Sequence, residues 1–496
     1  MKKERSKNNK WEFKDFAKTT FWFAFHTLIF VLGFIVILYA NAGFDIGVLL
    51  EHVQSEGVMK NLIYLIIAMC LVSLGIFLYF YNENNEFIKE TKNVNLVFLI
   101  LELSIVIMYA MGKYMVYARP FALCALLSLI LIEKRTAIFM NTVCCFLMFM
   151  IDAFLAIRVL EGHILYSSLI IGFSTSILAI YLVSGTNSRL MVFLQGFVIS
   201  LPIILCTICL EFNSLLISID PVFTAVVTVV AGFTSGMASV VGMMAIIPVF
   251  EKLFNRVTVY KLYELTDHKA PLLQKLNDKA PGTFNHCLVV STLAESCASA
   301  IGEDPLLARA CAYYHDIGKS EHPEYFTENQ SGYNPHNEIT PELSVDIIRA
   351  HATDGARIIR ENKLPTVLSD VAEQHHGTLH IRYFYMQASK FSEETLPLKD
   401  FAYKGPRPQT KIAAIIMLAD ACEAKSRSLP VRSHEKVDEA VREIIEERMD
   451  FEQFFECDIT MKELDIIRRT LTNALSGVHH ERVEYPKLKV GGNKYE

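Results

Sequence analysis

Long apolar runs alternate with short polar segments through the first half of the chain. A helix needs about 20 residues to cross a bilayer, and runs near that length lie at 21–41, 61–81, 95–112, 136–157, 164–184, 190–210 and 221–250. A shorter run at 120–132 begins at Pro120 and stops before Glu133-Lys134-Arg135, and we interpret it as an additional short span. The pattern therefore predicts a polytopic helical membrane domain at 21–250 with about eight spans.

The positions of the basic residues predict the orientation of these spans. The tail at 1–20 carries a basic cluster directly before the first span: Lys2, Lys3, Arg5, Lys7, Lys10, Lys14 and Lys18. Cytosolic segments are enriched in Lys and Arg, so we expect this tail in the cytosol. Eight spans also return the second half of the chain to the cytosol, whereas seven would export it. A cleaved signal peptide is disfavoured, because the run at 21–41 is too long and no small-residue cleavage site follows it.

Two acidic residues interrupt the apolar runs. Glu102 and Asp152 are costly in hydrocarbon, which makes them functional candidates, although a bond to a neighbouring helix explains each equally well. The last span has small residues at 232–236 and at Gly242, which favour close helix packing. No loop between spans is long enough to fold as a domain, and 43–60 is only a short connector.

Apolar positions recur every three to four residues in the second half, which is typical of helices. A charged, leucine-bearing stretch at 251–285 predicts a helical connector that ends at Pro281-Gly282-Thr283. Further helices are predicted at 286–301, 305–317, 342–362, 366–376, 408–428, 434–448 and 461–475. No run favours a strand. We therefore predict an all-α domain at 286–480, followed by a polar tail at 481–496.

The composition supports this division into a lipid-facing part and a water-facing part. The 496 residues are 52% hydrophobic, too many for an ordinary soluble enzyme, while the net charge of −6 comes from residues that mostly follow position 250. The eleven cysteines lie mostly in apolar or helical stretches, which favours reduced core thiols over disulfides. Cys206 and Cys209 form a CxxC pair inside a span, and we interpret this pair as packing.

Seven side chains of metal-ligand type stand on separate predicted helices: His286, His315, Asp316, His351, His375, His376 and Asp420. Imidazoles mixed with carboxylates suit Mn, Fe or Zn, and a bridging carboxylate can hold two such ions about 3.5–4 Å apart. A lone histidine is more often structural than a ligand, so the adjacent pairs carry the prediction. Seven histidines have no partner at a useful spacing and are interpreted as structural: His26, His52, His163, His268, His322, His380 and His434. A further pair, His479-His480, lies in a polar tail and is interpreted as solvated.

The order of these residues and their local sequences resemble the seven-transmembrane-receptor HD-domain (HDIG) family, whose characterised members are cyclic di-AMP phosphodiesterases. The matching strings are APGTFNH at 280–286, YHDIGK at 314–319, NPH at 334–336, EQHHGT at 373–378, GPRPQTK at 405–411 and MLAD at 417–420. They cover essentially all of 257–470. The family typically has a large extracellular domain after its first span, and here the 43–60 loop takes its place, which puts extracellular signal reception in doubt.

The resemblance implies two divalent metal ions, Mn or Fe. One is expected on His286, His315, Asp316 and Asp420, and the other on His351, His375 and His376, with Asp316 bridging. It further implies a phosphodiesterase in the bacterial inner (cytoplasmic) membrane that hydrolyses cyclic di-AMP to linear pApA, with both the N-terminus and the HD domain in the cytosol. The expected partners are this substrate and the lipid bilayer but no DNA or RNA, and a homodimer is left open.

The resemblance also suggests roles for residues that are not metal ligands. Lys319 is a catalytic candidate that would reach a phosphate as a point charge. Its alternative interpretation is an exposed helix lysine. Arg407, Gln409 and Lys411 are candidates for the substrate pocket by family analogy only.

Three alternatives remain from other functional classes. A cyclic di-GMP phosphodiesterase of the HD-GYP type would carry a GYP motif after the histidine pair, where this chain has Gly377-Thr378-Leu379. A nucleotidase or guanosine tetraphosphate hydrolase needs only an H, HD, D ligand set and leaves His351 and the 375–376 pair unexplained. A nucleotide-binding membrane receptor without catalysis would be marked by lost ligands, and none is lost.

Overall fold

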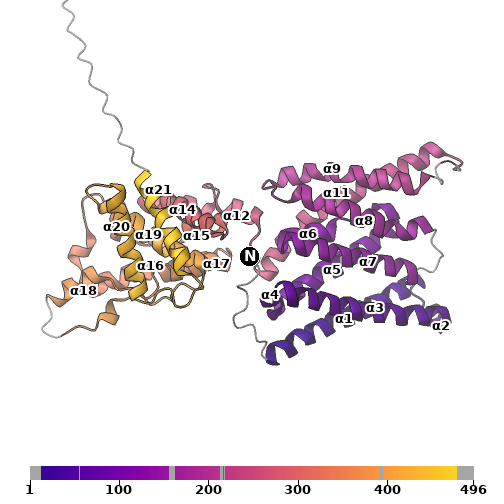
Figure 1. The fold of residues 1–496 in the computed structure, drawn as a ribbon, viewed down its shortest axis with the longest axis horizontal. Helices are drawn as coiled ribbons and strands as arrows, with labels where there is room; N and C mark the ends of the chain where they lie inside the picture. The colour runs from indigo at the N-terminus through magenta and orange to yellow at the C-terminus, as the bar shows by residue number, and fades with distance from the viewer. Residues whose placement is uncertain are drawn as a thin grey trace, which may run out of the picture. The chain divides into compact units, whose positions relative to one another are not determined.

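The computed structural model describes residues 13–54, 56–155, 162–212, 216, 218–390 and 395–477. The chain divides into two compact units, unit 1 at 1–260 and unit 2 at 261–496 (Figure 1). The tail before residue 13, the pair His479-His480 and the predicted polar tail at 481–496 lie outside the described residues. Within the described part no strand forms beyond one isolated bridge between His380 and Ala402. The predicted all-α fold is therefore confirmed.

Unit 1 is a bundle of apolar helices. Its elements are α1 (Phe13–Asn41), α2 (Ile46–Gln54), α3 (Glu56–Glu83), α4 (Asn85–Lys89), α5 (Thr91–Gly112), η1 (Val116–Ala118), α6 (Leu123–Leu131), α7 (Lys134–Leu155), α8 (Gly162–Val183), α9 (Arg189–Leu210) and α11 (Pro221–Phe254). Among the described residues, seven helices are long and apolar enough to cross a membrane: α1, α3, α5, α7, α8, α9 and α11. Large apolar side chains such as Leu71 and Leu205 stand exposed on them. The chain is a multi-pass membrane protein.

The eighth predicted span, at 120–132, is much shorter than the others. It consists of the nine-residue helix α6 preceded by the single turn η1, whereas a lipid-crossing helix needs about 20 residues. Every residue from Leu123 to Ser128 is buried. This segment is therefore surrounded by the other helices of the bundle.

Contacts between distant segments identify one end of the bundle. Three pairs bring together the start of α1, the turn between α3 and α5, the start of α7 and the end of α11: Thr19 Oγ1 with the Ile88 carbonyl at 3.2 Å, Arg135 Nη1 with Glu83 Oε2 at 3.5 Å, and Arg256 Nη2 with Asn93 Oδ1. Both α5 and α7 thus start at this end. The start of α1 and the end of α11 lie at this end too.

The opposite end is marked by two further contacts. Asn61 Nδ2 near the start of α3 donates to the Phe154 carbonyl near the end of α7 at 3.4 Å. Tyr117 of η1 donates to Glu211 Oε1 after α9 at 2.7 Å. Because α5 ends here and α7 starts at the other end, the chain returns through η1 and α6. Across the described residues, the path therefore runs between the two ends eight times, seven times in long helices and once in this short segment.

The polar and small residues singled out in the spans mostly serve packing. Asp152 Oδ1 accepts from Arg119 Nη2 at 2.8 Å, and both side chains are buried, which supports a bond to a neighbouring segment. A Cβ on Gly236 would lie 2.8 Å from the Ser200 Cα of α9. The predicted small-residue face is thus confirmed as a close contact between α9 and α11.

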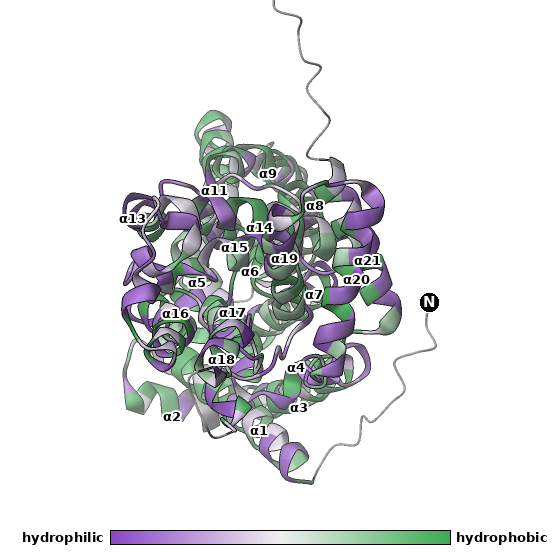
Figure 2. Cartoon of the chain, turned by 90° about the vertical axis from the view of Figure 1, so that its left-hand side faces the viewer, coloured by the Kyte–Doolittle hydropathy of each residue, from purple (hydrophilic) through white to green (hydrophobic). Residues whose placement is uncertain are grey.

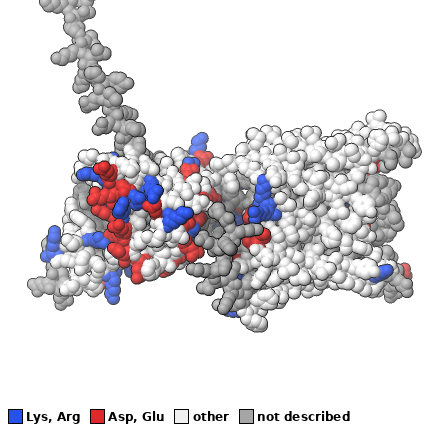
Figure 3. Space-filling model, in the orientation of Figure 1, with Lys and Arg blue, Asp and Glu red and all other residues white. Residues whose placement is uncertain are grey.

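Unit 2 is a helical domain with many charged side chains on its surface. Its elements are α12 (Val259–Leu265, starting at the unit boundary), α13 (Pro271–Lys279), α14 (Pro281–Ile301), α15 (Pro305–Tyr314), η2 (Ile317–Ser320), η3 (Pro323–Tyr325), η4 (Thr327–Asn329), η5 (Pro335–Glu338), α16 (Pro341–Glu361), α17 (Thr366–Gln374), α18 (Arg382–Ser389), η6 (Leu398–Phe401), α19 (Lys411–Ser428), α20 (His434–Asp450) and α21 (Met461–Gly477). Helices α20 and α21 are largely hydrophilic, whereas α8 and α9 of unit 1 are largely hydrophobic (Figure 2). On the face shown in Figure 3, charged side chains gather over unit 2.

Helix α19 forms the centre of unit 2. All its residues from Ile412 to Ala419 are buried, and it packs against α14, α15, α17, α20 and α21. Such a helix is apolar on every side because neighbours surround it. Cys422 and Glu423, one turn further along α19, are buried as well.

The region predicted as one helical connector at 251–285 contains four helical pieces: the end of α11, α12, α13 and the start of α14. Helix α11 ends at Asn255, which adopts the left-handed conformation with φ 51°. Pro271 and Pro281 each occupy the first turn of a new helix, where the missing N–H costs nothing. Helix α14 therefore starts at 281, earlier than the predicted 286, and carries the APGTFNH string from its second residue on, with Ala280 as the N-cap.

Candidate metal centre

All seven predicted ligand residues converge inside unit 2. His286 comes from α14, His351 from α16 and Asp420 from α19, while the pairs 315–316 and 375–376 directly follow α15 and α17. They form two groups, one of His286, His315, Asp316 and Asp420 and one of His351, His375 and His376. Within each group the ligand-type atoms lie within 4.8 Å of one another.

A tight backbone contact holds the His315–Asp316 turn in place. Helix α15 is capped by Asp304, whose side chain accepts from two backbone N–H groups, and it ends at Tyr314. Gly318 in the following turn η2 packs on α16 so closely that a Cβ there would lie 1.9 Å from the His351 carbonyl oxygen. Glycine at this position thus brings the turn and His351 together.

The first group is built around two carboxylates. His286 Nε2 lies 2.9 Å from Asp420 Oδ1 and 3.7 Å from Asp316 Oδ2. His315 Nε2 lies 3.3 Å from Asp316 Oδ2 and 3.9 Å from Asp420 Oδ1. Two imidazole nitrogens thus share the same two carboxylate oxygens.

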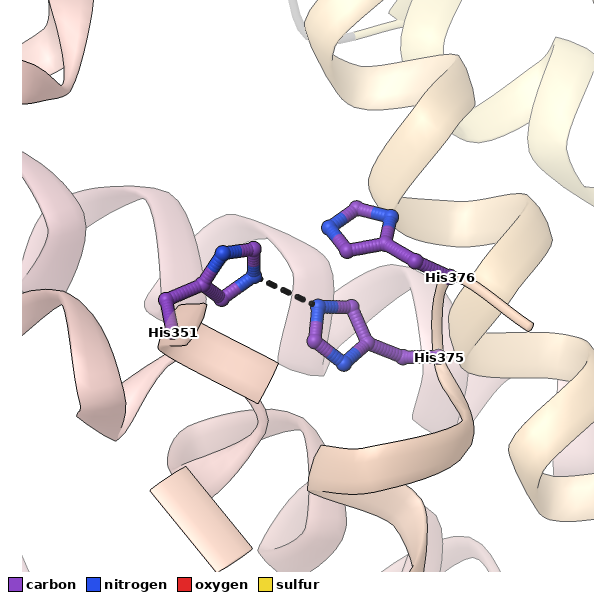
Figure 4. A group of neighbouring side chains, drawn as sticks. All are labelled: His351, His375 and His376. Carbon is purple, nitrogen blue, oxygen red and sulfur yellow. Dashed lines mark hydrogen bonds between the residues drawn. The ribbon is translucent and has the colours of Figure 1, made fainter. Parts of the chain in front are cut away.

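The second group consists of three imidazoles (Figure 4). His351 Nε2 and His375 Nε2 point toward each other at 3.3 Å. The His376 ring lies 4.0 Å from the His375 ring, centroid to centroid, and stacks on Tyr403 at 4.3 Å. Tyr403 also lies 6.1 Å from the His351 ring, centroid to centroid, so this tyrosine packs against two of the three imidazoles.

Asp316 lies between the two groups. Its Oδ2 faces the first group, as the distances above show, while its Oδ1 lies 3.4 Å from His351 Nε2 and 3.6 Å from His375 Nε2. The carboxylate is 1% exposed. Each group thus receives one oxygen from the same side chain, which is the arrangement of a bridging carboxylate.

Backbone carbonyls set the orientation of three imidazoles. The Nδ1 atoms of His315, His351 and His375 face the carbonyls of Ala312, Ile348 and Ala372. A carbonyl only accepts, so each Nδ1 carries the proton and each Nε2 presents a lone pair to the site.

The residues fit divalent cations. Two lone pairs that face each other at 3.3 Å, on His351 and His375, repel unless a cation lies near both. Within the described residues, His315 Nε2 is buried without a hydrogen-bond partner. Buried polar atoms normally have partners. Imidazole and carboxylate donors in this number suit Mn, Fe or Zn.

Electrostatics favour the ligand forms of the two carboxylates and of two imidazoles in the second group. In the first group, burial lowers the pKa of His315, but Asp316 and Cys287 raise it well above its usual value. Burial raises the pKa of Asp316, but the charges of Lys319 and His315 lower it by more than burial raises it. Its pKa therefore lies well below the usual range. Burial lowers the pKa of His351 to about 3 and that of His376 well below its usual value. The carboxylate is therefore ionised and these two imidazoles are neutral, as metal binding requires.

Glu423 is a part of the site that sequence reasoning missed. It is buried on α19, and its Oε2 lies 2.6 Å from His286 Nδ1. Arg427 Nε donates to its other oxygen at 2.6 Å. Burial lowers the pKa of His286, but Asp420 and Glu423 together raise it to about 10. The only sequence signal is the spacing, since Glu423 lies one helical turn after Asp420 on the same face.

Lys319 is not the exposed helix lysine of the alternative interpretation. It lies in η2 and is 13% exposed, with Nζ 2.7 Å from Asp316 Oδ2 and 3.0 Å from Glu328 Oε1. Its Nζ also lies 5.0 Å from the centre of the Phe326 ring. A buried cation therefore stands directly beside the carboxylate that joins the two groups.

The three residues assigned to a substrate pocket by analogy lie in other contacts. Lys411 Nζ is 2.6 Å from Glu463 Oε1, and Arg407 Nη2 is 3.2 Å from Glu452 Oε2. The Gln409 backbone N–H donates to the side chain of Gln374 at 3.0 Å. Their contribution to substrate binding stays a prediction.

Comparison with known proteins adds family relationships to this geometry. The model of an HD domain matches residues 283–425, and the model of a 7TM receptor with an intracellular HD hydrolase matches 59–258. Two curated relatives carry the name cyclic-di-AMP phosphodiesterase PgpH. The protein from Bacillus subtilis (strain 168) is 34% identical over 442 residues, which cover 84% of this chain and 60% of the relative. The protein from Listeria monocytogenes serotype 1/2a (strain 10403S) is 41% identical over 306 residues, which cover 61% of this chain and 42% of the relative.

This chain spans less than two thirds of the length of either relative. A solved structure, the HD domain of the L. monocytogenes phosphodiesterase PgpH in complex with cyclic-di-AMP, is 47% identical with a TM-score of 0.42. The match covers 43% of this chain and all of that one.

Proposed function

From its matches to a 7TM receptor with an intracellular HD hydrolase and to an HD domain, we propose that this chain belongs to that receptor family and that unit 2 hydrolyses cyclic di-AMP to linear pApA. The observation that carries this proposal is Asp316, whose two oxygens face two separate groups of ligand-type side chains. The names of the two curated relatives support the substrate.

HD domains hold divalent cations, and we propose two ions here, Mn or Fe. One would be held by His286, His315, Asp316 and Asp420, and the other by His351, His375 and His376 together with Asp316. Such a pair supplies Lewis acidity toward phosphate oxygens and activates water as a nucleophile near neutral pH.

The protein side chains contribute orientation and charge to the reaction. The Nε2 lone pairs of His315, His351 and His375 are fixed by their Nδ1 hydrogen bonds, so little reorganisation accompanies ligand binding. Lys319, held by Glu328, places a positive charge where it can offset the charge of a phosphate oxygen. Hydrolysis adds the water oxygen to phosphorus, and the leaving sugar oxygen takes up a proton.

We also propose that the start of α1 and unit 2 lie on the cytosolic side of the inner membrane. The start of α1 and the end of α11 occupy the same end of the bundle. The matched 7TM region at 59–258 contains six of the long helices together with η1 and α6. Seven passes within 59–258 are reached only if the short segment of η1 and α6 counts as one of them. Helix α1, which precedes this region, adds an eighth pass.

A substrate comparison tests the activity. The full chain in lipid nanodiscs is stripped of metal, reloaded separately with Mn²⁺ or Fe²⁺, and given cyclic di-AMP, cyclic di-GMP or guanosine tetraphosphate. We expect metal-dependent formation of pApA, with Asp316→Asn inactive. Tight binding of cyclic di-AMP without turnover would support the alternative of a membrane receptor without catalysis. Turnover of guanosine tetraphosphate alone would support the alternative of a guanosine tetraphosphate hydrolase, which needs only the H, HD, D ligand set.

A further inference from the structure

A histidine–glutamate pair lies in the helix bundle, apart from the metal centre. His26 of α1 and Glu102 of α5 are 5% and 15% exposed, and His26 Nδ1 lies 2.8 Å from Glu102 Oε1. Both residues lie near the midpoints of helices that are long and apolar enough to cross a membrane. Ionisable side chains at such a depth are costly and often mark functional sites.

The polar atoms of His26 are fully engaged. Its Nε2 lies 3.1 Å from Asn95 Oδ1, and its ring stacks on Phe98 at 4.7 Å with 3° between the planes. Because both ring nitrogens face oxygen atoms, one proton lies on Nε2 and a second lies between Nδ1 and Glu102. The pair is neutral overall, whichever partner holds that second proton.

Glu102 keeps one oxygen available for a ligand. No hydrogen bond from the described residues reaches its Oε2, and the side chain lines a cavity of 270 Å³ between α1, α5 and α7. Apart from Glu102 and Tyr109 the lining is apolar, with Ile37, Ile105 and Ile151 among its residues. An apolar cavity of about 150 Å³ holds benzene, so this one has room for a segment of an alkyl chain.

The cavity opens on the lipid-facing surface of the bundle. Two of its lining residues, Val36 and Val106, are 61% and 63% exposed. Gly33 also lines the cavity, and a Cβ added there would meet no atom within 4 Å. A molecule dissolved in the membrane therefore has a path along α1 to Glu102.

We propose that this cavity binds a neutral lipid with a hydroxyl head, which donates to Glu102 Oε2 while its chain lies against α1. Charge selects the head group. Since the His26–Glu102 pair is neutral, a hydroxyl adds no net charge, whereas an ammonium or a carboxylate would leave an uncompensated charge in apolar surroundings. This site is independent of the hydrolytic centre and gives the membrane half a ligand of its own.

A photoreactive probe tests the site and its head-group preference. The full chain in nanodiscs is exposed to hexadecanol that carries a diazirine and an alkyne, and the labelled residues are mapped by mass spectrometry. We expect labels on the cavity-lining residues of α1 and α5, displaced by unlabelled hexadecanol. The methyl ether of hexadecanol lacks the donor and should compete roughly 2- to 10-fold less well, the loss expected for one neutral hydrogen bond.

Two glycine variants distinguish binding in the cavity from binding elsewhere on the lipid-facing surface. Gly33→Leu fills the cavity and should abolish labelling there. Gly75→Leu, on α3 and also facing open space, should leave labelling intact. Labelling that survives Gly33→Leu, or equal competition by the alcohol and its ether, would overturn the proposal. If Gly33→Leu does not assemble, the competition with the unaltered chain decides alone.

Discussion

At the scale of residues, four imidazoles of the candidate metal centre are oriented by a polar partner at Nδ1, on the side of the ring away from the site. Backbone carbonyls hold His315, His351 and His375. His286 differs, because a charged side chain, Glu423, holds its Nδ1 at 2.6 Å. A carboxylate in this position raises the basicity of the imidazole and fixes its ring, so we expect the affinity of the first group for a metal ion to depend on Glu423.

We expect Glu423→Ala to weaken Mn²⁺ binding to the first group roughly 10- to 100-fold, the usual loss when such a supporting residue is removed. Titration calorimetry on the full chain measures this affinity. Glu463→Ala is the matched control, since Glu463 is a partly buried carboxylate that pairs with Lys411 rather than with a ligand residue. Equal affinities in the two variants would refute the role of Glu423.

Single residues differ in how far the sequence reveals them. Four of the seven candidate ligands form the pairs His315-Asp316 and His375-His376, and two more lie in the strings at 280–286 and 417–420. His351 lies in none of the matching strings and was predicted from its place in the order of the set. Glu423 and Glu328 could not be predicted, because an isolated glutamate on a helix or in a loop has no distinctive pattern. Their importance follows only from which segments pack together.

At the scale of elements, a few close backbone contacts position the ligands. Gly318 of η2 meets the His351 carbonyl of α16, and Gly355, one turn further along α16, lies beside the same contact. Apolar periodicity predicted the long helices of unit 2 within a few residues, except that α14 starts earlier. It did not predict α18, a short helix between polar segments, because eight residues carry too few repeats.

Gly318→Ala should disturb the contact between η2 and α16. The added Cβ would lie 1.9 Å from the His351 carbonyl oxygen, and such overpacking usually costs about 1–3 kcal/mol. Hydrogen exchange should then accelerate in 315–320 and 348–358. Gly355→Ala, whose nearest neighbour would be at 3.3 Å, should have a much smaller effect. Unchanged exchange in Gly318→Ala would contradict the proposed positioning.

At the scale of the whole molecule, the two units face different solvents and the path of the chain decides which side each end occupies. Hydropathy found the seven long helices but could not settle the short segment at 120–132, because α6 is buried by neighbouring helices rather than by lipid. The contact between Arg135 and Glu83 puts the start of α7 beside the end of α3, which supports a crossing by this segment.

The eight-pass path predicts that Tyr114 and Arg135, both well exposed, lie on opposite sides of the membrane. Tyr114→Cys should react with an impermeant maleimide in intact cells, whereas Arg135→Cys should react only in inside-out vesicles. The unaltered chain corrects for its own exposed cysteines, Cys70 and Cys209. Reaction of both variants from the same side would mean that η1 and α6 do not cross.

A metal titration tests the central claim most directly. Mn²⁺ is added stepwise to the metal-free full chain, and bound metal and pApA formed from cyclic di-AMP are measured in the same samples. We predict two ions bound per chain, with hydrolysis that rises as the second site fills, and neither full occupancy nor hydrolysis in Asp316→Asn. Complete hydrolysis with one ion bound per chain, or full activity in Asp316→Asn, would contradict a dinuclear centre joined by Asp316.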